Sequence, residues 1–60
     1  MMIMVQSRAI DERVWRDEVW RRNSITAYTT ARAKARLTGR VYRLVDQDGF
    51  VLEQVRDHQP

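Results

Sequence analysis

The clearest pattern of polar and apolar positions lies near the C-terminus, where the stretches 40–46 and 50–56 alternate on either side of Asp-Gln-Asp-Gly. This alternation is typical of β-strands. The four residues 46–49 suit a type I turn in which Gly49 adopts the left-handed conformation. The pattern therefore predicts an antiparallel β-hairpin.

The predicted turn also sets how the two strands of the hairpin pair. Apolar residues then meet apolar residues, and the one charged pair is complementary, with each cross-strand pair contributing about 0.2–1 kcal/mol. Both faces of the hairpin are apolar, so we expect a helix on one face and a partner on the other. The predicted pairs are Val45–Val51, Leu44–Leu52, Arg43–Glu53 and Val41–Val55. The four valines Val41, Val45, Val51 and Val55 form the face predicted for a protein partner.

Residues 24–38 read as an α-helix. Asn23 or Ser24 can cap its start and Gly39 can end it. The segment alternates like a strand in part, but Ala, Arg and Lys favour helices over strands. The helix face expected to pack against a sheet or another helix has mostly small side chains. It carries Ala27, Tyr28, Ala31, Ala35 and Thr38.

Residues 9–22 are predicted to form a first helix, with Ser7 as its cap. Acidic and basic residues recur four apart in the order that favours a helix. The apolar residues do not share one stripe, however, so this helix would be buried on several sides, and that points to a partner. The alternative is two strands, 13–16 and 19–23, which gives the order ββαββ. The apolar residues are Ile10, Val14, Trp15, Val19 and Trp20.

The whole chain is therefore expected to be a single small α+β domain. Two helices precede the hairpin, residues 2–7 form a short edge strand or arm, and 57–60 form a tail. A chain of 60 residues buries only a small core, so it usually needs an additional source of stability, such as disulfides, a bound metal or a second subunit. It has no cysteine, and its single histidine, His58, is near the end, so we expect no metal or other cofactor. Oligomerisation remains as a source of stability, so we expect a homodimer, or a chain that completes its core on a partner.

The composition argues against several functions. No cysteine nucleophile or glycine-rich phosphate loop is present, and the acidic residues of 11–18 read as helix ion pairs. A calcium loop around Asp46 and Asp48 would need ligands at Leu44 and Val55, so it fails. We therefore expect no enzyme activity and no small-molecule substrate. The apolar start, residues 1–5, is too short for a membrane span, and we expect a cytoplasmic protein.

Charge leaves a second function open. The net charge is +3, and five basic residues with no acid among them fall within 31–43. They can be a solvated helix edge or a patch for phosphate or acidic side chains. The predicted order of elements, a helix, a short turn, a second helix and a hairpin, resembles a winged helix-turn-helix domain in outline. No residue matches a motif specific to that family. The basic candidates are Arg32, Lys34, Arg36, Arg40 and Arg43.

The surplus apolar residues favour a different function. Trp15, Val19 and Trp20, with the valine face of the hairpin, exceed what so small a core can bury, and tryptophan is enriched in interface hot spots. The sequence therefore predicts a non-catalytic regulator or inhibitor that binds a larger enzyme or assembly, as small phage and mobile-element proteins do. The alternative is a nucleic-acid-binding regulator that uses the basic segment.

Overall fold

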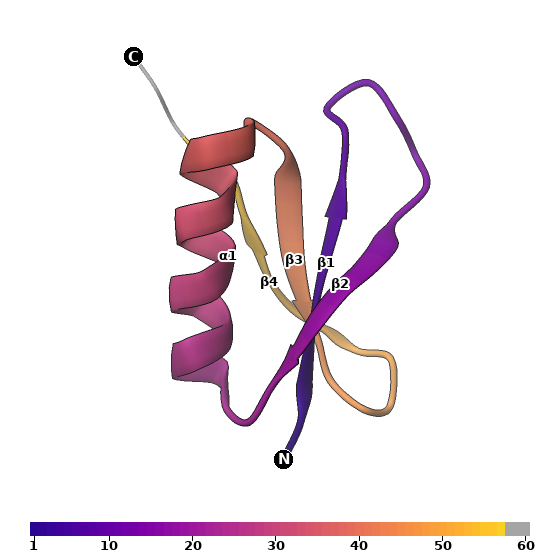
Figure 1. The fold of residues 1–60 in the computed structure, drawn as a ribbon. Coiled ribbons are helices and arrows are strands. Elements are labelled where there is room, and N and C mark those ends of the chain that lie inside the picture. Colours follow the sequence, from indigo (N-terminus) through magenta and orange to yellow (C-terminus); the bar gives the residue numbers. More distant parts are fainter. Residues whose placement is uncertain (58–60) are drawn as a thin grey trace.

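The computed structural model describes residues 1–57 as a four-stranded antiparallel sheet with one helix against one face (Figure 1). Most of the predicted tail, including His58, lies outside the described residues. The elements are β1 (Ile3–Arg8), β2 (Arg16–Arg21), α1 (Ser24–Thr38), β3 (Val41–Val45) and β4 (Val51–Val55). The strands lie in the order β2-β1-β3-β4.

The predicted helix at 9–22 is wrong. Residues 9–15 form a loop, and Arg16–Arg21 form β2, which pairs with β1. Each ion pair four residues apart would have given a helix only about 0.2–0.5 kcal/mol. As a strand, the segment instead pairs its backbone with β1 and sends Val19 towards the core. The order is ββαββ, but Asp17 and Glu18 lie inside β2, so the two strands considered above for this segment are also wrong.

Strand β1 is central, although its sequence suggested an edge strand or an arm. It pairs with β2 on one side and β3 on the other. Its residues alternate between the two faces of the sheet. Ile3 and Val5 join the core under α1, while Met4 is buried on the opposite face.

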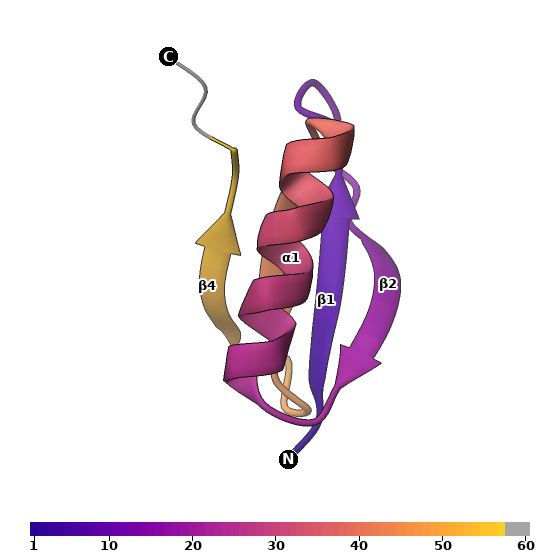
Figure 2. The same ribbon diagram turned by 60° about the vertical axis from the view of Figure 1, so that its left-hand side comes forward.

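Helix α1 has the bounds that the sequence predicts. The side chain of Asn23 accepts a hydrogen bond from the backbone N–H of Thr26 at 2.9 Å, and Gly39 ends the helix with φ 72°. Three alanines four residues apart are fully buried, and their small side chains let the helix lie close over β1 and β3 (Figure 2). The core under the helix consists of Ile3, Val5, Ala27, Ala31, Ala35, Tyr42, Leu44 and Val55.

The predicted hairpin is present, with its turn. The backbone N–H of Gly49 donates to the carbonyl of Asp46, and the Asp46 carboxylate accepts from the backbone of Asp48 and Phe50. Gly49 has φ 88°, a conformation that glycine adopts without strain.

The predicted register of the hairpin holds only next to the turn. Val45 pairs with Val51, but β4 then contains one extra residue, a β-bulge at Leu52. The bulge moves Val55 to the helix side of the sheet, where it joins the core. The pairs beyond it are Leu44–Glu53, Arg43–Gln54 and Tyr42–Val55, and they replace the predicted Leu44–Leu52, Arg43–Glu53 and Val41–Val55.

Candidate functional site

The face of the sheet opposite α1 carries a row of apolar side chains that crosses all four strands. Trp20 of β2 pairs with Met4 of β1, Met4 with Val45 of β3, and Val45 with Val51 of β4. We call these four residues the apolar row. Trp20 and Val51, at its two ends, remain 47% and 52% exposed. Leu52, which follows Val51, is 48% exposed. Met4 and Val45, in the middle of the row, are each only 8% exposed, so the surface that the row offers to a partner lies at its two ends.

The rest of this open face is covered by the loop between β1 and β2. The ring of Trp15 lies between two guanidinium groups, with its centroid 4.2 Å from Cζ of Arg43 and 5.1 Å from Cζ of Arg8. Arg43 donates to the side chain of Gln6, which donates in turn to Asp17. Arg8 also donates to three carbonyl groups of the loop. This network holds the loop on the sheet.

The predicted interface residues therefore have different environments. Trp20, Val45 and Val51 belong to the apolar row. Trp15 is held between two arginines in the covered part of the open face. Val41 pairs with Arg8 in this covered part and is only 1% exposed, so it offers no surface to a partner.

Val19 and Val55 face the helix instead. Val55 is a core residue that is 5% exposed, and Val19 packs against the core. Val55 therefore does not belong to the expected valine face, and Val19 does not belong to the predicted interface. Each edge strand contains a β-bulge, and an extra residue moves the side chains that follow to the other face of the sheet.

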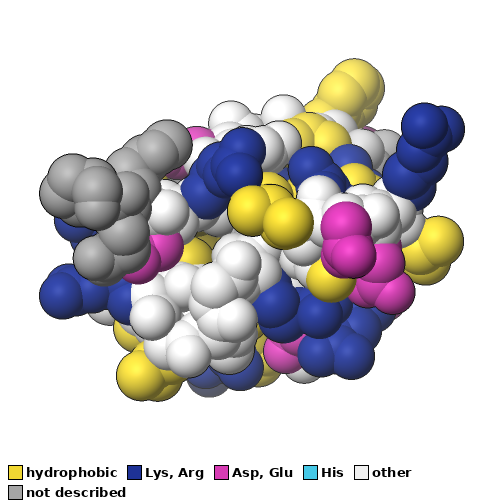
Figure 3. All heavy atoms as spheres, turned by 90° about the horizontal axis from the view of Figure 1, so that it is seen from above, with side chains coloured by type: hydrophobic (Ala, Val, Ile, Leu, Met, Phe, Trp, Pro, Cys, Tyr) yellow, Lys and Arg dark blue, Asp and Glu magenta, His cyan; other side chains and the backbone are white. Residues whose placement is uncertain are grey.

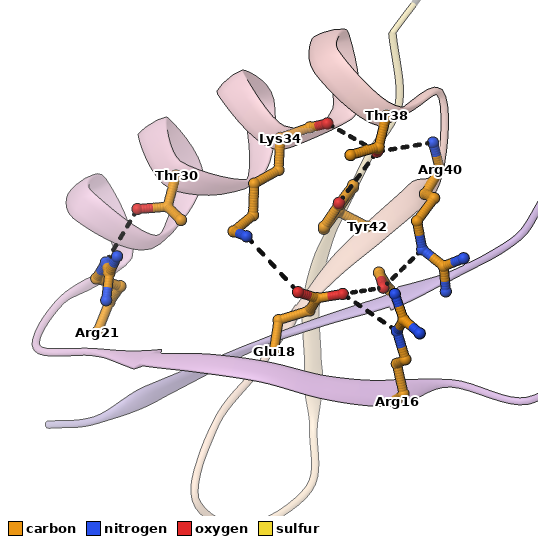
Figure 4. Close-up of polar contacts among 9 residues, drawn as sticks. Arg16, Glu18, Arg21, Thr30, Lys34, Thr38, Arg40 and Tyr42 are labelled. Atoms are coloured by element: carbon orange, nitrogen blue, oxygen red, sulfur yellow. Dashed lines mark hydrogen bonds and ion pairs between the residues drawn. The ribbon is translucent and has the colours of Figure 1, made fainter.

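The bulge in β2 also turns Glu18 towards the helix, where a polar cluster forms (Figure 4). The fully buried Ser7 hydroxyl donates to Glu18 Oε2 at 2.6 Å and accepts from Arg40 Nε at 3.0 Å. Lys34 Nζ of α1 lies 3.6 Å from Glu18 Oε1, and Arg16 Nε lies 3.3 Å from Oε2. Because Ser7 is buried and already donates its proton to a carboxylate, the cluster ties α1 to the sheet rather than forming a nucleophile.

The surroundings of Glu18 favour its charged form. The hydrogen bond from Ser7 lowers the pKa of Glu18 most strongly; partial burial raises it, and Arg16 and Lys34 lower it further. The net result is a pKa below the ordinary value for glutamate.

This depressed pKa predicts that acid weakens the fold at Glu18. The contribution of Glu18 is complete above the pKa it has in the unfolded chain and is lost as pH falls through its lower folded value. Glu18→Gln should lower the free energy of unfolding by about 1–3 kcal/mol at pH 7. Between pH 5 and pH 3, the free energy of unfolding of the variant should depend less on pH than that of the wild type. Urea unfolding of both proteins across this range measures the difference. Glu12→Gln, in the exposed loop, is the control, and an unchanged acid profile in Glu18→Gln would contradict the assignment.

The five residues of the predicted basic patch are not brought together. Lys34 pairs with Glu18, Arg40 donates to Ser7, and Arg43 lies against Trp15 on the open face. Arg32 and Arg36 lie on the side of α1 that faces β4, where Arg56 joins them around a hollow. Seen from above, basic side chains lie on several sides of the molecule rather than in one patch (Figure 3).

Sequence reasoning missed Gln6, Ser7, Arg8 and Arg56. The first three belong to β1, and the alternation Ile3, Val5, Ser7 against Met4, Gln6, Arg8 was the signal that could have revealed their two faces. Arg56 follows the last residue of β4, and nothing in its sequence surroundings indicated that it would line a hollow with Arg32 and Arg36.

Three findings concern the described chain as a whole. Helix α1 lacks the length and the apolar character needed to cross a membrane. Within residues 1–57, no group of three or more histidine, cysteine, aspartate or glutamate side chains could hold a metal ion. Comparisons with models of protein families, with curated proteins and with solved structures found no match.

Proposed function

We propose that this protein is a small non-catalytic regulator or inhibitor that binds a larger protein through the open face of its sheet. The observation that carries this proposal is the apolar row. It runs across the full width of the sheet and ends in two side chains, Trp20 and Val51, that are each about half exposed. Large apolar side chains left exposed on a small domain, such as these two, are candidates for an interaction site.

The composition of this face suits a protein partner. A half-exposed tryptophan next to the buried Met4 can insert into an apolar pocket, as the anchors of protein interfaces do. Arg8 and Arg43 of the same face are already engaged by Trp15, by Gln6 and by loop carbonyls, so a partner would meet the exposed ends of the apolar row rather than these two charges. A partner that matches this surface would offer an apolar pocket for the tryptophan.

The proposal is tested by affinity purification from lysate of the source cells, with nuclease and at moderate salt. Wild type should recover one discrete larger protein, and Trp20→Thr should lose it. Threonine suits a strand, so the variant should remain folded. Leu37→Gln is the matched control, because Leu37 is 86% exposed on α1, away from the open face. Equal recovery by wild type and Trp20→Thr would contradict the proposal.

The predicted homodimer gives a further outcome of the same test. A second copy of this chain could cover the apolar row in place of a larger protein. Sedimentation of the purified protein distinguishes the two. If the wild type is a dimer that Trp20→Thr converts to a monomer, the row is a self-association surface, and the larger-protein proposal fails.

A further inference from the structure

A second candidate site lies on the other side of the molecule, in the hollow between α1 and the edge strand β4. We call it the α1/β4 groove and define it by Tyr28, Arg32 and Arg36 of α1 and by Glu53, Gln54 and Arg56 of the β4 segment. It includes a cavity of about 340 Å³ that Tyr28, Arg32 and Arg56 help to line. It also includes a smaller one of about 130 Å³ lined by Arg32, Arg36, Arg56 and Asp57. Arg32 and Arg56 line both cavities, so the two adjoin.

The three arginines of the groove differ from most of the others in how they are engaged. Arg8, Arg40 and Arg43 are held by partners inside the fold. Arg32 donates one long hydrogen bond, 3.3 Å, to the hydroxyl of Tyr28. Its other N–H groups remain available to a ligand. Within residues 1–57, the side chains of Arg36 and Arg56 have no hydrogen-bond or ion-pair partner.

The three arginines come from both walls of the groove. Arg32 and Arg36 are one turn apart, which is about 6 Å along the helix. Arg56 comes from the opposite wall of the same hollow. Guanidinium binds phosphate through two parallel N–H groups, and successive phosphates of an extended strand can meet successive arginines. Tyr28 adds an aromatic side chain to the lining, a common companion of such grooves.

We propose that the α1/β4 groove binds the phosphodiester backbone of single-stranded nucleic acid, without sequence preference. Arg32, Arg36 and Arg56 each contact a phosphate. Glu53 and Asp57 line the groove with negative charges, and their repulsion of phosphate keeps the binding weak. The site is independent of the function proposed above, because it shares no residue with the apolar row.

The test is the fluorescence anisotropy of a labelled deoxythymidine oligonucleotide of about 12 nucleotides, measured at several salt concentrations. For three phosphates, log Kobs should fall against log salt with a slope of about −2. Arg36→Ala and Arg56→Ala should each weaken binding and make the slope shallower by about 0.7. Glu53→Gln should strengthen binding, and Trp20→Thr should leave it unchanged.

The control separates the groove from general charge attraction. Arg13→Ala removes the same charge from the exposed loop, and circular dichroism checks that each variant is folded. An equal loss in Arg13→Ala and Arg36→Ala would overturn the proposal, as would the absence of binding at low salt. Tighter binding of poly-glutamate than of the oligonucleotide would assign the groove to an acidic protein instead. Tighter binding of a duplex of equal length would overturn the assignment to a single strand.

Discussion

Replacing Tyr42 with alanine is expected to destabilise the domain by about 3–5 kcal/mol. Tyr42 heads the fully buried side chains in volume, and it lies where the helix meets the sheet. Its loss leaves a cavity that the alanines Ala31 and Ala35 of α1 are too short to fill. A domain of 60 residues is stable by only about 3–9 kcal/mol, so the variant should lose about half of this stability or more. Urea unfolding followed by circular dichroism measures the effect.

Tyr42→Phe separates packing from hydrogen bonding. The Tyr42 hydroxyl lies 3.1 Å from the hydroxyl of Thr38, at the end of α1. Phenylalanine keeps the ring and removes this one contact, so the expected cost is about 0.5–1.5 kcal/mol. If Tyr42→Phe costs as much as Tyr42→Ala, the ring is not the main packing element, and this description of the core is wrong.

Trp20→Thr is expected to reduce affinity for the partner recovered in the purification by about 30-fold or more, which corresponds to about 2 kcal/mol or more. Trp20 is the largest exposed side chain of the apolar row, and such aromatic residues dominate the energetics of interfaces. Isothermal titration with the purified partner measures the change in Kd.

The same variant should change folding stability far less than Tyr42→Ala does, because Trp20 is already about half exposed. Leu37→Gln should change neither affinity nor stability appreciably. A Trp20→Thr protein that binds normally would remove the apolar row from the interface. One that loses binding only because it has unfolded would be identified by circular dichroism.

Local signals in the sequence were sufficient for α1 and for the turn of the hairpin. Asn23 and Gly39 mark the helix ends by side-chain capping and by a left-handed backbone, and Gly49 marks the turn in the same way. Each of these features depends on residues close together in the chain. The predicted pairing of Val45 with Val51, next to the turn, was correct for the same reason.

The errors concern how the strands pair rather than local caps and turns. Nothing within 9–22 indicates that part of this segment pairs with β1, or that β1 has β3 on its other side. The bulges at Glu18 and Leu52 carry no glycine or other local mark. They nevertheless decide that Val19 and Val55 face the helix, so Val55 is lost from the valine face predicted for a partner and Val19 from the predicted interface.

The placement of the basic residues could not be predicted from the sequence either, because it also depends on the fold. Counting charges along 31–43 gave one patch, yet the fold divides it among the polar cluster, the open face and the α1/β4 groove. Arg56, distant in sequence, completes the groove. In contrast, Trp20 was identified as an interface candidate by residue type alone, and the structure leaves it about half exposed.

The central claim, that the open face of the sheet binds a larger protein, is tested most directly by a photoreactive phenylalanine analogue at position 20. The same group at position 37, on the outer side of α1, is the matched control. After irradiation in lysate of the source cells, we predict one discrete adduct with a larger protein from position 20 and none from position 37. Equal adducts from both positions, or an adduct with only a second copy of this chain, would contradict the claim.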